Sequence, residues 1–447
     1  MADAIAGKTR SFVLGNAAPV GGLRRDKLIE VAFYLFVIVS CSSLSISRLG
    51  DFYYFQMGVE PEPIFPLFVY AVIKYLPLIV IATHIKELYL TVPKMPFPWL
   101  VVAAAFLSAM FSEDASRTIN MASAVLICLS LSILYVRYRG ADAALLFIWR
   151  LGVVLLAISA VLALSGSDYA LTHFMQPGWR GIVSDKNYFG VVSGLMLLLT
   201  LYLPAIVRKP IRLRAGVIAL CGLCLACSNA KGALLATMAG IAFVFLHNRY
   251  LVNYSLWKKA VVLTVLASLI AYFGILYLPD LLVMLGRDPT LSNRTLIWAG
   301  VLPLTFTHPF GMGYGMSGGA AAYSAVSVTV NSLYAPIDNA YIVLALDLGW
   351  SFVAIYVVWL LSLVLKPRQE VGEPIVGSEL LIAIAAFNLV LGFVLVVGGP
   401  YIGFPLLLLF IALAGIVQSK TASGTAGGSG GMSLQSTQRK REIVRER

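Results

Sequence analysis

The chain has 447 residues, of which 60% are hydrophobic and only 12% are charged, and its mean hydropathy is +0.87. A soluble domain of this length needs far more charge to cover its surface, so the composition excludes an ordinary soluble globular protein. The net charge of +12 does not require a nucleic-acid partner, because the basic residues gather in short segments between apolar runs.

Repeated apolar runs predict membrane-spanning helices, since the hydrocarbon core of a bilayer needs about 20 apolar residues per helix. Residues 1–27 are polar and basic and are expected to form a flexible cytoplasmic lead without a cleavable signal. About 12 spans are predicted, near 28–46, 65–83, 97–111, 118–136, 145–165, 188–207, 215–227, 231–247, 260–279, 339–365, 378–398 and 402–418. The predicted fold class is an all-α, polytopic integral membrane protein whose transmembrane domain covers residues 28–418.

An even number of spans places both termini on one side of the membrane, and the charges identify that side as the cytoplasm. It receives most of the lysines and arginines, including those of the tail, residues 419–447, which is Gly/Ser-rich, then basic, and expected to be disordered. The opposite side receives only Arg48, Arg117, Arg180, Lys186, Lys231, Arg287 and Arg294.

Two pairs of short spans are predicted to be hairpins. Residues 97–136 are expected to turn at the sequence SEDASR. Residues 215–247 are flanked by Arg214 and Arg249, which should both face the cytoplasm, so two spans joined at SNAKG are favoured over one long helix.

The outer segment between the predicted fifth and sixth spans, residues 166–190, contains two cations, Arg180 and Lys186. Asn187 follows in the expected first turn of the sixth span, where backbone amides and the helix dipole favour an anion. Lys231, near the outer tip of the second hairpin, adds a third cation. The alternative interpretation is a loop whose charges bind lipid phosphates.

A long periplasmic loop, residues 280–338, is predicted between the ninth and tenth spans. It contains Arg287 and Arg294, and a short amphipathic helix is expected to follow. Pro289 argues against one helix that carries both arginines on the same face.

The same loop continues with the sequence HPFGMGYG, in which Gly311, Gly313 and Gly315 stand at alternate positions. That spacing suits a bend at which the backbone approaches a ligand or another helix. The chain then re-enters the membrane with Asp338 and Asn339 at the interface.

The outer side thus gathers cations in three loops, with Asp338 as the best-placed acid of the long loop. Such an excess suits an anionic group held near the membrane surface, such as a lipid-linked phosphate or pyrophosphate. No P-loop, HExxH or DxD-type motif occurs, so neither a nucleotide nor a metal mechanism is predicted, and no cofactor is expected. Cys221, Cys224 and Cys227 lie within apolar runs and are expected to pack between helices.

Four motifs resemble the O-antigen ligase/polymerase superfamily and occur in the family's order: GWRGIVSDKNYFG, SNAKGALLA, GRDPTLSNRTLIW with HPFGMGYG, and DNAYIVLALDLGW. The likeness is greatest to bacterial exopolysaccharide (Wzy-type) polymerases. It covers about residues 175–355, and the surrounding spans agree in number only.

Members of this family are GT-C-like, multi-span glycosyltransferases that join glycans carried on undecaprenyl pyrophosphate at the periplasmic face of the inner membrane. The resemblance therefore implies a polymerase of lipid-linked repeat units in exopolysaccharide or lipopolysaccharide synthesis, acting without a metal and with inversion at the anomeric carbon. Its implied partners are the undecaprenyl-pyrophosphate-linked glycan, an acceptor glycan or lipid A-core and, optionally, a chain-length regulator.

The resemblance also implies roles for single residues. Asp338 would be the general base, and Arg294 would stabilise the leaving group as part of a pyrophosphate site formed by Arg180, Lys186, Lys231, Arg287 and Arg294. Two positions depart from the family pattern, since many relatives have arginine at Lys231 and histidine at Asp338. Lysine keeps the charge but loses the bidentate fork, and aspartate either acts as a base or only orients the acceptor.

A further set of residues is expected to position donor and acceptor: Asn187, Trp298, His308, Gly311, Gly313, Gly315, Asn339 and Tyr341. His308 is the weaker alternative to Asp338 as the base and is expected mainly to hold the bend before the glycines.

Two other functions compete with the polymerase. The first is a ligase of the same family, which transfers the glycan to lipid A-core. The second is a flippase or transporter, which needs charged residues lining the membrane interior, whereas this chain has Lys74 and few other deep charges.

Overall fold

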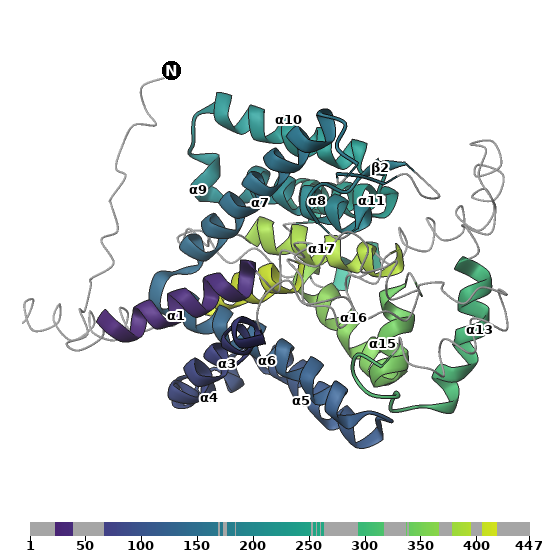
Figure 1. The fold of residues 1–447 in the computed structure, drawn as a ribbon. Coiled ribbons are helices and arrows are strands. Elements are labelled where there is room, and N and C mark those ends of the chain that lie inside the picture. Colours follow the sequence, from purple (N-terminus) through teal and green to yellow (C-terminus); the bar gives the residue numbers. More distant parts are fainter. Residues whose placement is uncertain are drawn as a thin grey trace, which may run out of the picture.

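The structure is a computed structural model, and it describes residues 23–38, 67–168, 170–172, 177–183, 185–251, 254–255, 257–259, 261–262, 294–316, 337, 339–365, 378–394 and 405–417. The described part is mostly helical, as predicted, and Figure 1 shows its helices packed against one another in several directions. The predicted span at 260–279 lies almost wholly outside these residues, as does most of the long loop.

The first group of helices contains α1 (Leu23–Phe36), α3 (Leu67–Thr83), α4 (Ile85–Tyr89), α5 (Pro96–Leu107) and α6 (Ala115–Arg139). The axes of α3 and α4 are bent by 74° at the break between them. The predicted hairpin at 97–136 is confirmed: α5 continues into a 3-10 turn (Ser108–Phe111), and α6 begins after Asp114, whose side chain accepts a hydrogen bond from the backbone N–H of Arg117.

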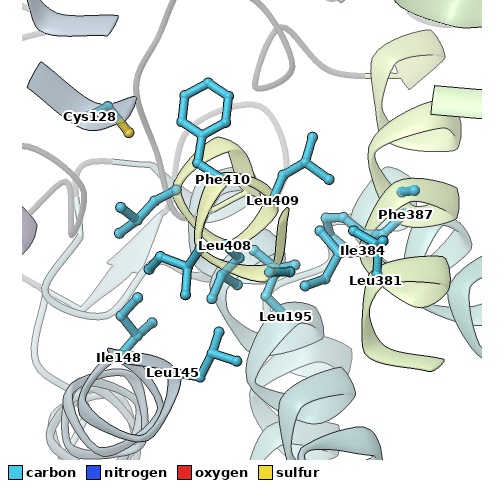
Figure 2. Close-up of a cluster of buried hydrophobic side chains, with 14 of the residues drawn as sticks. Cys128, Leu145, Ile148, Leu195, Leu381, Ile384, Phe387, Leu408, Leu409 and Phe410 are labelled. Carbon is cyan, nitrogen blue, oxygen red and sulfur yellow. The ribbon is translucent and has the colours of Figure 1, made fainter. Parts of the chain in front are cut away.

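The second group contains α7 (Ala141–Leu164), α8 (Lys186–Tyr202), α9 (Pro204–Val207), α10 (Ile211–Cys227), α11 (Lys231–Leu246) and α17 (Ser378–Val394). Residues 215–247 are broken into α10 and α11 at 228–230, as the flanking arginines predicted. Buried side chains of α7, α8 and α17 surround the last described helix, Pro405–Val417, whose residues Leu408, Leu409 and Phe410 lie in the centre of the cluster in Figure 2.

Helix α11 runs antiparallel to α17, and two contacts fix that direction. Asn248, just after α11, donates a hydrogen bond to Glu379 at the start of α17 (2.7 Å), and Gly240 faces the carbonyl of Ala383 further along. The C-terminal end of α17 therefore lies near the N-terminal end of α11. We call this end of the bundle, where α8 and α11 begin and α17 ends, the site end.

The third group contains α13 (Arg294–Thr307), α15 (Ala340–Leu348) and α16 (Trp350–Leu365). The prediction of a single span at 339–365 is wrong. Helix α15 stops at Leu348, and α16 begins after Gly349, which has φ +84° and lies so close to the carbonyl of Pro309 that a β-carbon would overlap it. Only glycine combines that backbone conformation with such a close approach.

Three described helices are long and apolar enough to cross a membrane, Ala115–Arg139, Ala141–Leu164 and Lys231–Leu251, and the bent α3–α4 pair raises the number to four. Several shorter apolar helices accompany them. The described helices therefore have the character of a membrane protein, while the total of twelve spans stays a prediction.

The described residues also contain a small β-sheet, which was not predicted. Two short strands, β1 (Leu171–Thr172) and β2 (Gly178–Trp179), pair in antiparallel fashion just before α8. They form a small hairpin that ends next to Arg180.

Candidate functional site

The β1–β2 hairpin fixes the backbone at Arg180. The N–H groups of Arg180 and Gly181 both donate to the carbonyl of Ala170, at 2.9 and 3.1 Å. Gly181 has φ +62° and presses against the side chain of Ser159 on α7, and the Ser159 hydroxyl accepts the N–H of Ile182 at 3.1 Å. The side chain of Arg180 thus extends from a backbone segment that is anchored to α7, and this side chain is partly exposed.

The same hairpin packs on the turn between α10 and α11. A β-carbon at Gly178 would lie 2.6 Å from the carbonyl oxygen of Ser228, and the Asn229 side chain donates to the carbonyl of Pro177 at 3.2 Å. Lys231 is the first residue of α11, directly after this turn, and its side chain is exposed. The structure therefore brings the loops of Arg180 and Lys231 together, as expected from the sequence.

Asp185 starts α8. Its carboxylate accepts the backbone N–H groups of Asn187 (2.8 Å) and Tyr188 (3.2 Å), which fixes the first turn. Desolvation by the surrounding protein raises the pKa of this carboxyl group, and the two amide donors oppose the rise. Lys186 and Asn187 are therefore held at a capped helix start, and both side chains are partly exposed.

The starts of α8 and α11 are in direct contact. Gly190 in α8 has so little room that a β-carbon there would lie 2.4 Å from the β-carbon of Ala230, just before α11. Three predicted cations, Arg180, Lys186 and Lys231, thus come from segments that touch one another at the site end.

Helix α15 begins at the same end. The Asn339 side chain accepts the N–H groups of Tyr341 and Ile342, at 3.0 and 3.1 Å, and is 7% exposed. The hydroxyl of Tyr341 donates to the carbonyl of Leu389 in α17 at 2.6 Å, and its ring lies against Gly392. Asn339 therefore fixes the first turn of α15, and Tyr341 holds that turn on the C-terminal part of α17.

Arg294 is the first described residue of α13. Helix α13 packs on α15 through a small apolar cluster that includes Ile297 and Val301 from α13 and Ile337 just before α15. Trp298 lies against this cluster, and its indole Nε1 is buried without a hydrogen-bond partner among the described residues. The start of α13 is thus linked to the site end through α15.

His308 lies at the other end of α13. The helix has 14 residues, which corresponds to a length of about 20 Å at 1.5 Å per residue. The imidazole of His308 is exposed, and its Nδ1 lies 3.1 Å from the carbonyl of Leu304. The backbone carbonyl of His308 accepts the N–H of Gly311. These contacts agree with the expected role of His308 in the bend, and the length of α13 separates His308 from Arg294.

Gly311, Gly313 and Gly315 all have positive φ and all are buried. β-Carbons at Gly311 and Gly313 would lie 2.2 Å from the carbonyl oxygen of Asp347 and 2.5 Å from the side chain of Ser112. The expected close approach of the backbone is therefore observed, and the neighbours are protein segments: the end of α15 and the tip of the α5–α6 hairpin.

Two residues with a clear role at this joint were not among the predicted site residues. Asp347, which is fully buried, accepts the N–H of Gly315 on its carboxylate at 2.9 Å. Ser108 accepts the N–H of Tyr314 at 2.9 Å. An acid inside an apolar stretch was the available signal for Asp347, whereas nothing in the local sequence of Ser108 indicates its partner.

Asp338 and Arg287, the predicted base and the fifth predicted cation, lie outside the described residues. Arg180, Lys186, Lys231 and Arg294 are described; Lys186 and Lys231 are the first residues of helices, and Arg294 is the first described residue of α13. Lysine and arginine side chains from neighbouring segments can together bind an anion.

A family model described as Wzy_C, O-antigen ligase, matches residues 215–357. Over those residues the chain is similar to the O-antigen ligase family. The matched region runs from α10 into α16 and contains Lys231, Arg294, Asn339 and the three glycines, whereas Arg180 and Lys186 precede it. It supports membership of the O-antigen ligase/polymerase superfamily, whose members are glycosyltransferase-like enzymes that use glycans and lipid-linked substrates. No curated protein and no solved structure matches the chain at a significant level.

Proposed function

We propose that this protein is an inner-membrane glycosyltransferase that polymerises undecaprenyl-pyrophosphate-linked repeat units at the periplasmic face, in the synthesis of exopolysaccharide or lipopolysaccharide. The observation that carries the proposal is the position of the cations. Lys186 and Lys231 each begin a helix, and Arg294 is the first described residue of α13. A cation at a helix N-terminus is unfavourable by about 0.3–1 kcal/mol, because the helix dipole is positive there.

An anion bound near these side chains would offset that penalty. A pyrophosphate supplies several charged oxygens, and it can accept hydrogen bonds from lysine, arginine and backbone N–H groups together. The contacts between the β1–β2 hairpin, the Ser228–Ala230 turn and the start of α8 support a shared site with Arg180 as a further member. We include Arg287 of the long loop in the same pyrophosphate site.

The proposed reaction is a direct displacement. The acceptor hydroxyl transfers its proton to the Asp338 carboxylate as its oxygen forms a bond to the anomeric carbon of the donor glycan. The bond from that carbon to the pyrophosphate oxygen breaks, so the configuration inverts and undecaprenyl pyrophosphate leaves. The cations stabilise the charge that develops on the leaving group.

Asn339 supports this assignment because it immediately follows Asp338 and is fixed as the cap of α15. We assign donor and acceptor positioning to Asn187, Trp298, Asn339 and Tyr341, and a structural role to His308 and the three glycines in holding the long loop.

A ligase is the second candidate, because the matching family model is that of O-antigen ligases. Purified protein incubated with lipid-linked repeat units separates the two functions. A polymerase converts them into long chains on the carrier lipid, whereas a ligase transfers glycan only when lipid A-core is added. Failure to consume the donor under either condition would refute the glycosyltransferase proposal.

The same assay tests the proposed independence from metals. Activity should survive a chelator, because the proposed stabilisation comes from lysine and arginine side chains. Loss of turnover on chelation, restored by a divalent cation, would contradict that part of the proposal.

Asp338 is tested by comparing Asp338→Asn with Asp338→His. Asparagine keeps the size and hydrogen-bonding capacity of the side chain but cannot accept the proton, so we expect turnover to fall by about 10²–10⁴-fold. Histidine is a competent base and should retain more activity than asparagine. A fully active Asp338→Asn protein would leave this residue only an orienting role.

A further inference from the structure

A cavity of about 320 Å³ lies between the segment that follows α4, the C-terminal turns of α6 and the last described helix. It is lined by Leu90, Thr91, Lys94, Met95, Ile133, Val136, Arg137, Ala414 and Val417. None of these residues belongs to the proposed glycosyltransferase site, and the charge pattern predicts that Lys94 and Arg137 face the cytoplasm. The volume is at the lower end of those that hold small ligands.

The cavity has apolar walls and a cationic rim. Met95, Ile133, Val136 and Ala414 are buried residues that contribute to the walls. The lining also contains Lys94 and Arg137, which are both exposed residues. The arrangement therefore suits a ligand with an apolar part and an anionic head, because each part would meet its own kind of surface.

The neighbouring helix indicates that the cavity opens at the level of the membrane surface. Helix α4 turns away from α3 by 74°. Its residues Ile85 and Tyr89 are 62% and 73% exposed, and Leu90 beyond its end is 60% exposed, while Lys86 and Glu87 lie between them. A short helix with exposed apolar and charged residues is typical of a segment that lies in the headgroup region.

We propose that this cavity binds one anionic phospholipid of the cytoplasmic leaflet. An acyl chain covers the apolar walls, and the phosphate group lies between Lys94 and Arg137. Glu87 orients the arginine, since its carboxylate lies 3.2 Å from Nε of Arg137. The proposal is independent of the reaction at the opposite end of the helices.

Charge and shape favour a lipid over two other occupants. The chain's own tail follows Val417, but its charged end is basic and would be repelled by the rim. Free phosphate would pair with the cations but leave the apolar walls uncovered, so it does not explain why the cavity has apolar walls. A zwitterionic lipid would fill the walls but gain less from two cations.

Native mass spectrometry of the purified full-length protein tests the site. Phosphatidylglycerol and phosphatidylcholine are added in equal amounts, and the ratio of the two bound forms is measured. We expect the wild-type protein to prefer phosphatidylglycerol. Lys94→Gln removes one rim charge and should reduce that preference by about fivefold, while Ala414→Phe fills the cavity and should reduce binding of both lipids.

Lys209→Gln is the matched control, since Lys209 is an exposed cation on the same predicted side and does not line the cavity. It should bind both lipids as the wild type does. Equal binding of the two lipids by the wild type, or wild-type preference in Lys94→Gln, would overturn the proposal. An equal loss in Lys209→Gln would assign the preference to general surface charge and overturn the site as well. Inorganic phosphate at millimolar concentration should not displace the lipid, and displacement would identify a free phosphate site instead.

Discussion

Arg294 is the first described residue of α13 and lies at the end of that helix opposite His308. The helix dipole does not favour a cation near that end. In the proposed site this arginine binds the pyrophosphate, and this role distinguishes it from basic residues that only set the orientation of the chain in the membrane.

Arg294→Ala should therefore abolish polymer formation while the protein still accumulates in the membrane. The expected change in unfolding free energy is within about 1 kcal/mol, because the lost charge does not stabilise its helix. Polymer length is measured on gels and protein amount by immunoblot. Arg117→Ala is the matched control, since Arg117 is an exposed arginine on the same predicted side near the start of α6, and it should leave polymer unchanged. Retained polymer in Arg294→Ala would remove its central role.

Gly313 is a residue whose importance comes from its lack of a side chain. It has φ +106°, and a β-carbon there would lie 2.5 Å from the side chain of Ser112. Gly313→Ala should lower the free energy of unfolding by about 1–3 kcal/mol, through backbone strain and overlap together. Thermal unfolding in detergent measures the effect.

Gly222→Ala provides the comparison for that measurement. Gly222 lies within α10, and a β-carbon there would meet nothing within 4 Å. Alanine should raise stability by up to about 1 kcal/mol, because it favours the helix. If the two alanine variants unfolded at the same temperature, the close contact at Gly313 would not restrict which side chain is tolerated there.

At the scale of single elements, α8 depends on its cap. The Asp185 carboxylate accepts hydrogen bonds from the first-turn amides of Asn187 and Tyr188. Asp185→Ala should cost about 1 kcal/mol of stability and also reduce activity, because Lys186 and Asn187 lie in the turn that loses its anchor.

Asp185→Ser separates the cap from the charge. Serine is an equally good cap, so it should restore stability and most of the activity. An inactive but stable serine variant would show that the carboxylate itself takes part in the reaction. Activity and thermal unfolding are measured on the same preparations.

Several elements could be predicted from local sequence, because the decisive residues are close together in the chain. The positions of Arg214 and Arg249 correctly predicted two helices within residues 215–247. The break at Gly349 was missed because residues 339–365 are apolar on both sides of it, and the reason for the break is the distant carbonyl of Pro309. The β1–β2 hairpin was missed because its strands have two residues each.

At the scale of the whole molecule, most of the described candidate site residues could be named from the sequence, because of their charges and their order along the chain. The sequence could not show that the glycine segment binds the α5–α6 hairpin. Tyr314 and Ser108, which make one of those contacts, are 206 residues apart in the sequence. Contacts of this range depend on how all the helices pack, and no local pattern records them.

Topology is the corresponding prediction for the whole molecule. Lys209 and Arg117 are exposed in the structure and are assigned to opposite sides by the distribution of basic residues. In intact spheroplasts, a membrane-impermeant thiol reagent should label Arg117→Cys but not Lys209→Cys, above the background of the wild-type cysteines. Lysed membranes should label both. The reverse pattern would invert the orientation and place the proposed site in the cytoplasm.

The joint at residues 308–316 also has a consequence for building chimaeras with related enzymes. The neighbours of its glycines, Ser112, Met121 and Asp347, already occupy the space that other side chains would need. A transplanted segment from a relative with different residues there would collide with the recipient's hairpin, however well its own loop is preserved. Exchanges should therefore transfer residues 108–121, 308–316 and 339–349 together, because these described stretches contact one another.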